Sequence, residues 1–142
     1  MDIRALTPTY AVSPQIALED LPAIKAAGYT TIINNRPDSE IPPHLHHERM
    51  QAAATALGLT YVQNTVIGGA MTDANVADQA KAIAAASGPV FAYCASGNRS
   101  SVVWALANAG KMPTDDLIGL PAKFGYQLEG LRGQLETLAA KP

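Results

Sequence analysis

Cysteine is almost absent from this chain of 142 residues, which contains only Cys94. A lone thiol excludes an internal disulfide and gives no support to an oxidising compartment. Charged residues are scarce too: they make up 15% of the chain, with a net charge of −2. No cluster of Lys and Arg occurs, which argues against nonspecific binding to nucleic acid or to an acidic membrane.

Long apolar runs are missing as well. No stretch approaches the roughly 20 residues of a membrane-spanning helix, and no signal-peptide pattern opens the chain. We therefore expect a cytoplasmic protein that does not bind membranes. Hydrophobic residues make up 48% of the chain, which is enough for a sizeable core. Residues 1–142 are predicted to form one domain, and its oligomeric state stays open.

Strand-like and helix-like segments alternate along the chain. Short runs of apolar and β-branched residues predict strands at residues 10–12, 29–34, 60–66 and 90–93, the first of them at a sheet edge. Helical periodicity and cap residues predict helices at residues 18–27, 44–57, 73–86 and 98–109. Residues 111–142 are expected to be a helical part of the same domain, with an apolar face that includes Phe124 packed on the sheet. The predicted architecture is a single α/β domain with a mostly parallel sheet of four or five strands flanked by helices.

The residues around Cys94 carry the clearest functional signal. A predicted strand and a predicted helix flank the loop Cys94-Ala95-Ser96-Gly97-Asn98-Arg99-Ser100. Loop N–H groups backed by a helix N-terminus form a concave anion site, and a cysteine in such a site is a reactive thiolate. Arg99 can grip an oxyanion with two parallel donors. The alternative is a buried, inert cysteine, but the spacing of Gly97 and Arg99 from Cys94 favours function.

We therefore expect Cys94 to be a nucleophile and Arg99 to complete an oxyanion cradle. The residues predicted to bind the substrate through this loop are Ala95, Ser96, Gly97, Asn98 and Ser100. The expected ligand is a small anionic substrate or a phosphorylated molecule.

A phosphoester reaction also needs a proton for the leaving oxygen, and a carboxylic acid is its usual source. Asp73 is the first candidate, because its glycine-containing loop leaves the predicted carboxyl edge of the sheet. The alternative role for Asp73 is a helix cap. Asp38 is the second candidate, with a turn as the favoured alternative. Arg36 is predicted either to bind a substrate anion or to pair with Asp38 or Glu40.

A histidine cluster at residues 44–47, followed by Glu48, suggests a metal site at first sight. His44 would share one helical face with His47 or Glu48. No second ligand group with a recognisable spacing follows, however, so we expect these side chains to be solvated. Neither a metal nor a cofactor is predicted.

Several segments together resemble the phosphatase-like domain family of the bacterial β-lactamase-hydrolase-like proteins. These segments are residues 12–15, 32–38, 68–73, 94–101 and 125–126, and the resemblance covers residues 6–131. It implies a fold related to dual-specificity and tyrosine phosphatases, with Cys94 as nucleophile and Arg99 as the phosphate-binding arginine. One departure is the loop length: four residues separate Cys94 from Arg99, where tyrosine phosphatases place five. The shorter loop is similar to that of rhodanese sulfurtransferases.

Three functions stay open at this point. In the first, Cys94 attacks a phosphate monoester, and water then hydrolyses the thiophosphate. In the second, Cys94 carries a persulfide and passes sulfur to an acceptor without a general acid. In the third, the loop only binds an anion, and the domain regulates a partner. The resemblance favours the first function, whereas the loop length favours the second.

Overall fold

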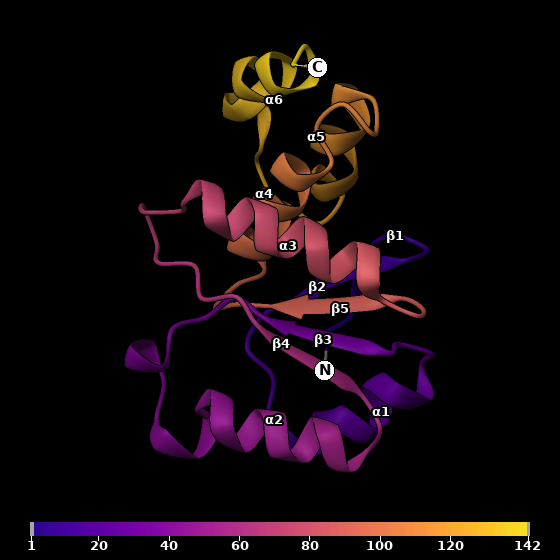
Figure 1. Cartoon of the computed structure of the whole chain (residues 1–142), viewed down its shortest axis with the longest axis vertical. Helices are drawn as coiled ribbons and strands as arrows, with labels where there is room; N and C mark the ends of the chain where they lie inside the picture. Colours follow the sequence, from indigo (N-terminus) through magenta and orange to yellow (C-terminus); the bar gives the residue numbers. More distant parts are fainter. Residues whose placement is uncertain (1, 142) are drawn as a thin grey trace.

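The computed structural model describes residues 2–141, and its middle layer is a five-stranded sheet in the spatial order β1-β2-β5-β3-β4 (Figure 1). The strands are β1 (Arg4–Thr7), β2 (Tyr10–Ser13), β3 (Thr31–Asn34), β4 (Thr60–Gln63) and β5 (Val90–Tyr93). Strands β2, β5, β3 and β4 run parallel, and β1 pairs antiparallel with β2. The predicted α/β class with a mostly parallel sheet is confirmed.

The prediction of an edge strand at residues 10–12 is wrong. Strand β2 lies inside the sheet, hydrogen-bonded to β1 on one side and to β5 on the other, and all four of its residues are buried. The true edge is β1, whose only buried residue is Leu6. A single inward-facing residue in four gives almost no alternating pattern, and this is why the edge strand escaped prediction.

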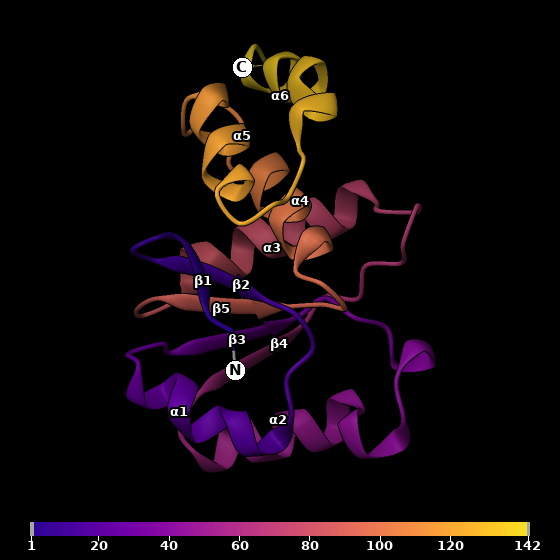
Figure 2. The same ribbon diagram turned by 180° about the vertical axis from the view of Figure 1, so that it is seen from behind.

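Helices cover both faces of the sheet (Figures 1 and 2). One face carries α1 (Leu21–Ala26) and α2 (His47–Ala56), and the other carries α3 (Asp73–Ala85) and α4 (Asn98–Ala107). Beyond α4 lie α5 (Thr114–Ala122) and α6 (Arg132–Ala139). Short 3-10 helices occupy residues 18–20, 38–40, 43–45 and 129–131. Within residues 2–141, no helix combines the length and apolarity needed to cross a membrane.

The C-terminal helices meet the sheet only in part. Leu117, Leu128 and Leu135 are buried in the same core cluster as Val12 of β2. Phe124, by contrast, is 39% exposed, so its predicted packing on the sheet is wrong. The chain turns beside it at Gly125, whose φ is +90°, and α5 and α6 pack on each other and on α4. The apolar residues do recur at helical spacing, but many of them face other helices and not the sheet.

The strand register brings three loops to one edge of the sheet. Asn34 at the end of β3 pairs with Gln63 of β4 and with Tyr93 of β5, so the three strands stop at the same level. The loops that follow, residues 35–46, 64–72 and 94–97, therefore leave side by side (left in Figure 1). The carboxyl edge of a parallel sheet is where such folds bind ligands.

Candidate active site

Cys94 lies where β5 ends and the chain turns toward α4. Its N–H donates to the carbonyl of Ser13 on β2 (3.4 Å), so the sheet still holds this residue. The residue is 1% exposed. The N–H of Gly97 donates to Cys94 Sγ at 3.1 Å. The loop thus directs one of its own backbone donors at the sulfur.

The turn at position 97 requires glycine for two independent reasons. The φ angle of Gly97 is +98°, in the left-handed region, and a Cβ there would lie 2.1 Å from the hydroxyl of Tyr126. That hydroxyl donates to the carbonyl of Ser96 (2.7 Å) and accepts from Arg4 (2.7 Å). Tyr126 thus braces the loop from the C-terminal part of the chain.

The backbone N–H groups of the loop divide into used and free donors. Gly97 donates to the sulfur, and Asn98 donates to the hydroxyl of Ser96 at 3.2 Å. The remaining groups, in the loop and the first turn of α4, meet no acceptor within residues 2–141. These are the N–H groups of Ala95, Ser96, Arg99 and Ser100. Free donors at a helix N-terminus can bind an anion.

The guanidinium of Arg99 is held from two sides. Its NH1 donates to the carbonyl of Val66 (2.8 Å) and to Oε2 of Glu40 (3.0 Å), and its NH2 donates to Oε1 of Glu40 (2.7 Å). This bidentate pair raises the pKa of Arg99 and lowers the pKa of Glu40. Both groups are therefore charged at neutral pH, and Arg99 has a fixed orientation.

Arg36 pairs with Glu40, which is one of the two roles that the sequence left open. Its Nε donates to Oε1 of Glu40 at 3.1 Å, and its NH1 donates to the side chain of Gln15 at 3.3 Å. Glu40 is a residue of this site that sequence reasoning did not single out for a role of its own. The available signal was its place in the polar loop after β3, on the same edge as Cys94.

Beneath the loop lies a buried, uncharged hydrogen-bond network. Gln79 accepts from Asn35 (2.9 Å) and Asn64 (2.8 Å) and donates to the hydroxyl of Tyr10 (3.0 Å). Tyr10 in turn donates to the carbonyl of Ser100 (2.9 Å), whose hydroxyl donates to Asn35 (2.8 Å). The Ser100 side chain is thus committed to this network, and its backbone N–H is the group left for a substrate.

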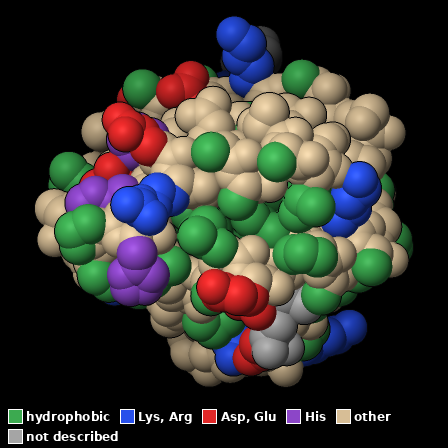
Figure 3. Space-filling view, turned by 90° about the horizontal axis from the view of Figure 1, so that it is seen from below, with side chains coloured by type: hydrophobic (Ala, Val, Ile, Leu, Met, Phe, Trp, Pro, Cys, Tyr) green, Lys and Arg blue, Asp and Glu red, His purple; other side chains and the backbone are tan. Residues whose placement is uncertain are grey.

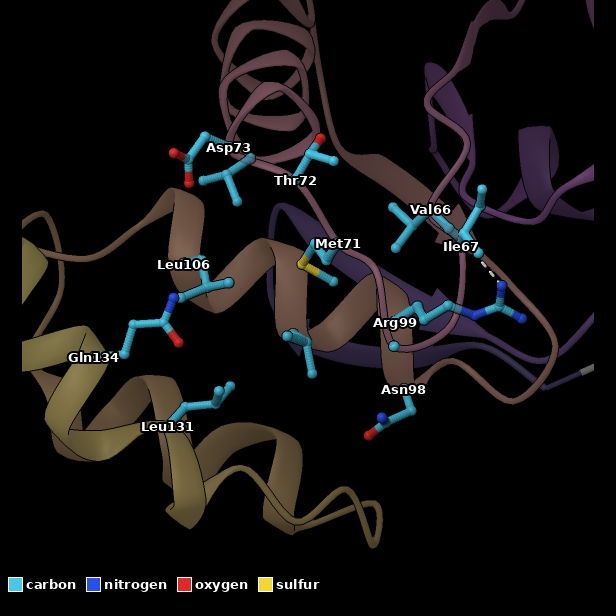
Figure 4. Close-up of a pocket in the computed structure, with 13 residues that line it drawn as sticks. Val66, Ile67, Met71, Thr72, Asp73, Asn98, Arg99, Leu106, Leu131 and Gln134 are labelled. Atoms are coloured by element: carbon cyan, nitrogen blue, oxygen red, sulfur yellow. Dashed lines mark hydrogen bonds between the residues drawn. The ribbon is translucent and has the colours of Figure 1, made fainter.

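Asp73 is the exposed first residue of α3, and Thr72 is the helix cap, with its hydroxyl accepting from the N–H of Asn75 (3.1 Å). Asp73 and Arg99 line one pocket of about 370 Å³, where they stand at opposite sides (Figure 4). Most of the wall between them is apolar and includes Val66, Ile67, Met71, Val76, Val102, Leu106 and Leu131.

Asp38 is hydrogen-bonded to His47, the first residue of α2. Its carboxylate accepts from the backbone N–H of His47 (2.9 Å) and contacts the His47 ring. Although burial opposes ionisation, these contacts hold the pKa of Asp38 below its usual value. The histidines gather with charged side chains where α2 begins (Figure 3). Among residues 2–141, no three His, Cys, Asp or Glu side chains are arranged to hold a metal ion.

Comparison with known proteins places the chain in a sequence family. Residues 2–111 match the phosphatase-like domain of beta-lactamase hydrolase-like proteins. The beta-lactamase hydrolase-like protein of Agrobacterium fabrum is 34% identical over 134 residues, which cover 93% of this chain and 31% of that protein. The chain thus spans about a third of the length of the curated relatives it matches.

Solved structures share the fold. A candidate phosphatase from Neisseria meningitidis superposes with a TM-score of 0.80 at 30% identity, covering 97% of this chain and 99% of that one. Tk-PTP in its active form gives 0.75 at 14% identity, with coverages of 99% and 97%. Pseudomonas aeruginosa TpbA, solved as a cysteine-to-serine variant in complex with phosphotyrosine, gives 0.56 at 16% identity, with coverages of 94% and 89%. The last two likenesses extend to the fold alone.

Proposed function

Since this chain belongs to the phosphatase-like domain family of beta-lactamase hydrolase-like proteins, we propose that it hydrolyses phosphate monoesters through a cysteine thiolate. One observation carries the proposal: Cys94 Sγ accepts the backbone N–H of Gly97, in a loop that has further backbone N–H groups without an acceptor. Arg99 adds a fixed cation at the same edge. A thiolate, free backbone donors and an oriented guanidinium are what nucleophilic attack on phosphorus requires.

In the proposed reaction, Cys94 Sγ attacks phosphorus and forms a sulfur–phosphorus bond. The bond from phosphorus to the ester oxygen breaks, and that oxygen leaves with a proton. Water then attacks the thiophosphate, releasing inorganic phosphate and regenerating the thiol. The free N–H groups of the loop and the Arg99 guanidinium stabilise the charge on the phosphoryl oxygens in both steps.

Asp73 is the proposed donor of the leaving-group proton. Its carboxyl belongs to the pocket that also takes in Arg99 and Asn98. In the conformation described, Asp73 stands across the pocket from Arg99 (Figure 4), so donation requires the segment before α3 to close toward the loop. This segment contains Gly68 and Gly69, and Gly69 has a φ of +76°.

We also propose that residues 1–142 work as one unit, with residues 111–142 as part of the domain. The support comes from Tyr126, which lies beyond the matched family segment and yet hydrogen-bonds to Ser96 in the loop. A small phosphorylated molecule, met in the cytoplasm, is the proposed ligand.

A sulfurtransferase is the second candidate, and the length of the loop favours it. Only four residues separate Cys94 from Arg99, which makes a small cradle suited to one extra sulfur atom. Cys94 would take the outer sulfur of thiosulfate, releasing sulfite, and the persulfide would pass that sulfur to cyanide as thiocyanate. This reaction needs no general acid. A third candidate, a regulatory domain that only binds an anion, needs no turnover at all.

Hydrolysis of p-nitrophenyl phosphate tests the proposal. Wild type and Cys94→Ser should be compared between about pH 5 and pH 8, with Asp73→Asn as the variant for the acid. We expect activity that vanishes in Cys94→Ser, and activity that falls by about a hundredfold or more in Asp73→Asn. An inactive wild type that forms thiocyanate from thiosulfate and cyanide would replace the proposal with the sulfurtransferase. Tungstate binding without either turnover would favour the regulatory domain.

A further inference from the structure

A single carboxylate joins two arginines beside Cys94. Oε1 of Glu40 accepts from Arg99 NH2 (2.7 Å) and from Arg36 Nε (3.1 Å), while Oε2 accepts from Arg99 NH1 (3.0 Å). The Glu40 side chain is 32% exposed, and those of Arg36 and Arg99 are 21% and 17% exposed. The cluster is therefore partly desolvated, which strengthens its hydrogen bonds relative to those of a fully exposed pair.

The donors of Arg99 can be counted. A guanidinium carries five N–H bonds in a rigid plane. Both N–H bonds of NH1 are used, by Val66 and Glu40, and one N–H of NH2 is used by Glu40. The Nε–H and the second N–H of NH2 remain. These two bonds are parallel and lie on one edge of the plane, which is the fork that grips two oxygens of one oxyanion.

The free edge of Arg99 is left for a ligand. Arg99 lies in the first turn of α4, five positions after Cys94, and Glu40 occupies only its NH1–NH2 edge. Cys94 also contributes, after Glu40, to the raised pKa of Arg99. A carboxylate that competed with the substrate would instead occupy the Nε–NH2 edge.

We propose that Glu40 is a positioning residue: it clamps the NH1–NH2 edge of Arg99 so that the Nε–NH2 fork is aimed at an oxyanion bound at Cys94. The inference rests on the proposed function for its catalytic meaning. Its effect on oxyanion binding can be measured without turnover.

Arg36 completes the clamp by holding Glu40. It is itself anchored to the side chain of Gln15 (3.3 Å), and the backbone N–H of Gln15 donates to the carbonyl of Ala95 in the loop (3.3 Å). The clamp is therefore tied to the same loop that it serves. Two guanidinium groups and one carboxylate leave a net charge of +1, which suits an incoming anion.

The dissociation constant of tungstate, a tetrahedral oxyanion, tests the clamp by calorimetry on the full chain. We expect Glu40→Gln to raise it roughly tenfold or more, because an unaimed arginine loses its bidentate contact. Glu48→Gln is the matched control, since Glu48 is exposed on α2, and its constant should equal that of wild type. In Arg99→Lys, which lacks the fork, adding Glu40→Gln should raise the dissociation constant of tungstate about threefold or less.

If Glu40 had a merely structural role, Glu40→Gln would lower the melting temperature, and its effect on tungstate binding would not depend on whether Arg99 is present. Glu40→Asp, which keeps the charge on a shorter chain, is expected to lose less affinity than Glu40→Gln, and it serves if the amide variant does not fold. Tungstate binding as tight in Glu40→Gln as in wild type, or tighter, would overturn the clamp. If wild type binds tungstate but hydrolyses no phosphate monoester, the proposed function fails while the clamp is still decided by the binding constants.

Discussion

The loop at Cys94 is supported by two hydrogen-bonded regions of opposite character. Beneath it lies the uncharged network of Tyr10, Asn35, Asn64, Gln79 and Ser100, all fully or almost fully buried. Beside it lies the ionic cluster of Arg36, Glu40 and Arg99, whose side chains are partly exposed. Desolvating charge is costly, whereas buried amides and hydroxyls need only satisfied partners. The molecule therefore keeps charge at its partly exposed edge and neutral groups where the backbone is fixed.

The two regions also hold different parts of the site: one holds backbone, and the other holds a side chain. The buried network grips the backbone at Ser100 and the strand ends at Asn35 and Asn64, so it sets the shape of the loop. The ionic cluster grips one side chain, that of Arg99. Damage to the first region should therefore appear mainly as lost stability, and damage to the second mainly as lost oxyanion binding.

Gln79→Leu breaks the buried region and should have the largest effect on stability. It leaves Asn35, Asn64 and Tyr10 without their shared partner, and we expect a loss of about 2–4 kcal/mol. Denaturant unfolding measures this, with exposed Gln51→Leu on α2 as the control that should change little. A fully stable Gln79→Leu protein would show that the network does not hold the loop.

Gly97→Ala attacks the loop itself. The new Cβ would meet the Tyr126 hydroxyl, and the alanine would have to adopt an unfavourable φ. We expect a loss of about 1–3 kcal/mol in the free energy of unfolding, together with weak tungstate binding. Adding Tyr126→Phe to this variant removes the shortest contact, that with the hydroxyl, but leaves the ring atom Cζ at 2.9 Å and the backbone strain. The double variant should regain part of the stability in the same unfolding measurement. No recovery would mean that the backbone angle and the remaining ring contact account for the cost.

Tyr126→Phe alone removes two hydrogen bonds, to Ser96 and from Arg4. The aromatic ring stays in place, so we expect a loss of about 1 kcal/mol in the free energy of unfolding. Because the loop loses its brace, hydrogen exchange at the amides of residues 95–98 should quicken. Unchanged exchange would show that the C-terminal part is only packed beside the loop.

Acid should act on the ionic region and spare the neutral one. The pKa of Glu40 is lowered in the folded protein, chiefly by its hydrogen bonds to Arg99. Its stabilising effect is therefore present above the unfolded value of 4.5 and is lost as the pH falls through the lowered folded value. The stability difference between wild type and Glu40→Gln should shrink over that range in acid titrations. The difference between wild type and Gln79→Leu should stay level.

The sequence was most informative where the chemistry is local. The strand, loop and helix around Cys94 occupy neighbouring positions, so spacing alone predicted the cradle around Gly97. The predicted parallel sheet also placed the glycine-containing loop before Asp73 at its carboxyl edge. The sequence could not predict which side chains pair at this edge. Glu40 and Arg99 lie 59 positions apart, and spacing along the chain carries no information about such contacts.

Trapping the covalent intermediate tests the central claim most directly. Wild-type protein would be mixed with p-nitrophenyl phosphate, quenched in acid within a turnover, and examined by mass spectrometry of the intact chain and its peptides. We predict one added phosphoryl group on Cys94, absent from Cys94→Ser and diminished in Glu40→Gln. A chain that gains no phosphoryl group, but gains one sulfur atom on Cys94 from thiosulfate, would contradict the phosphatase mechanism.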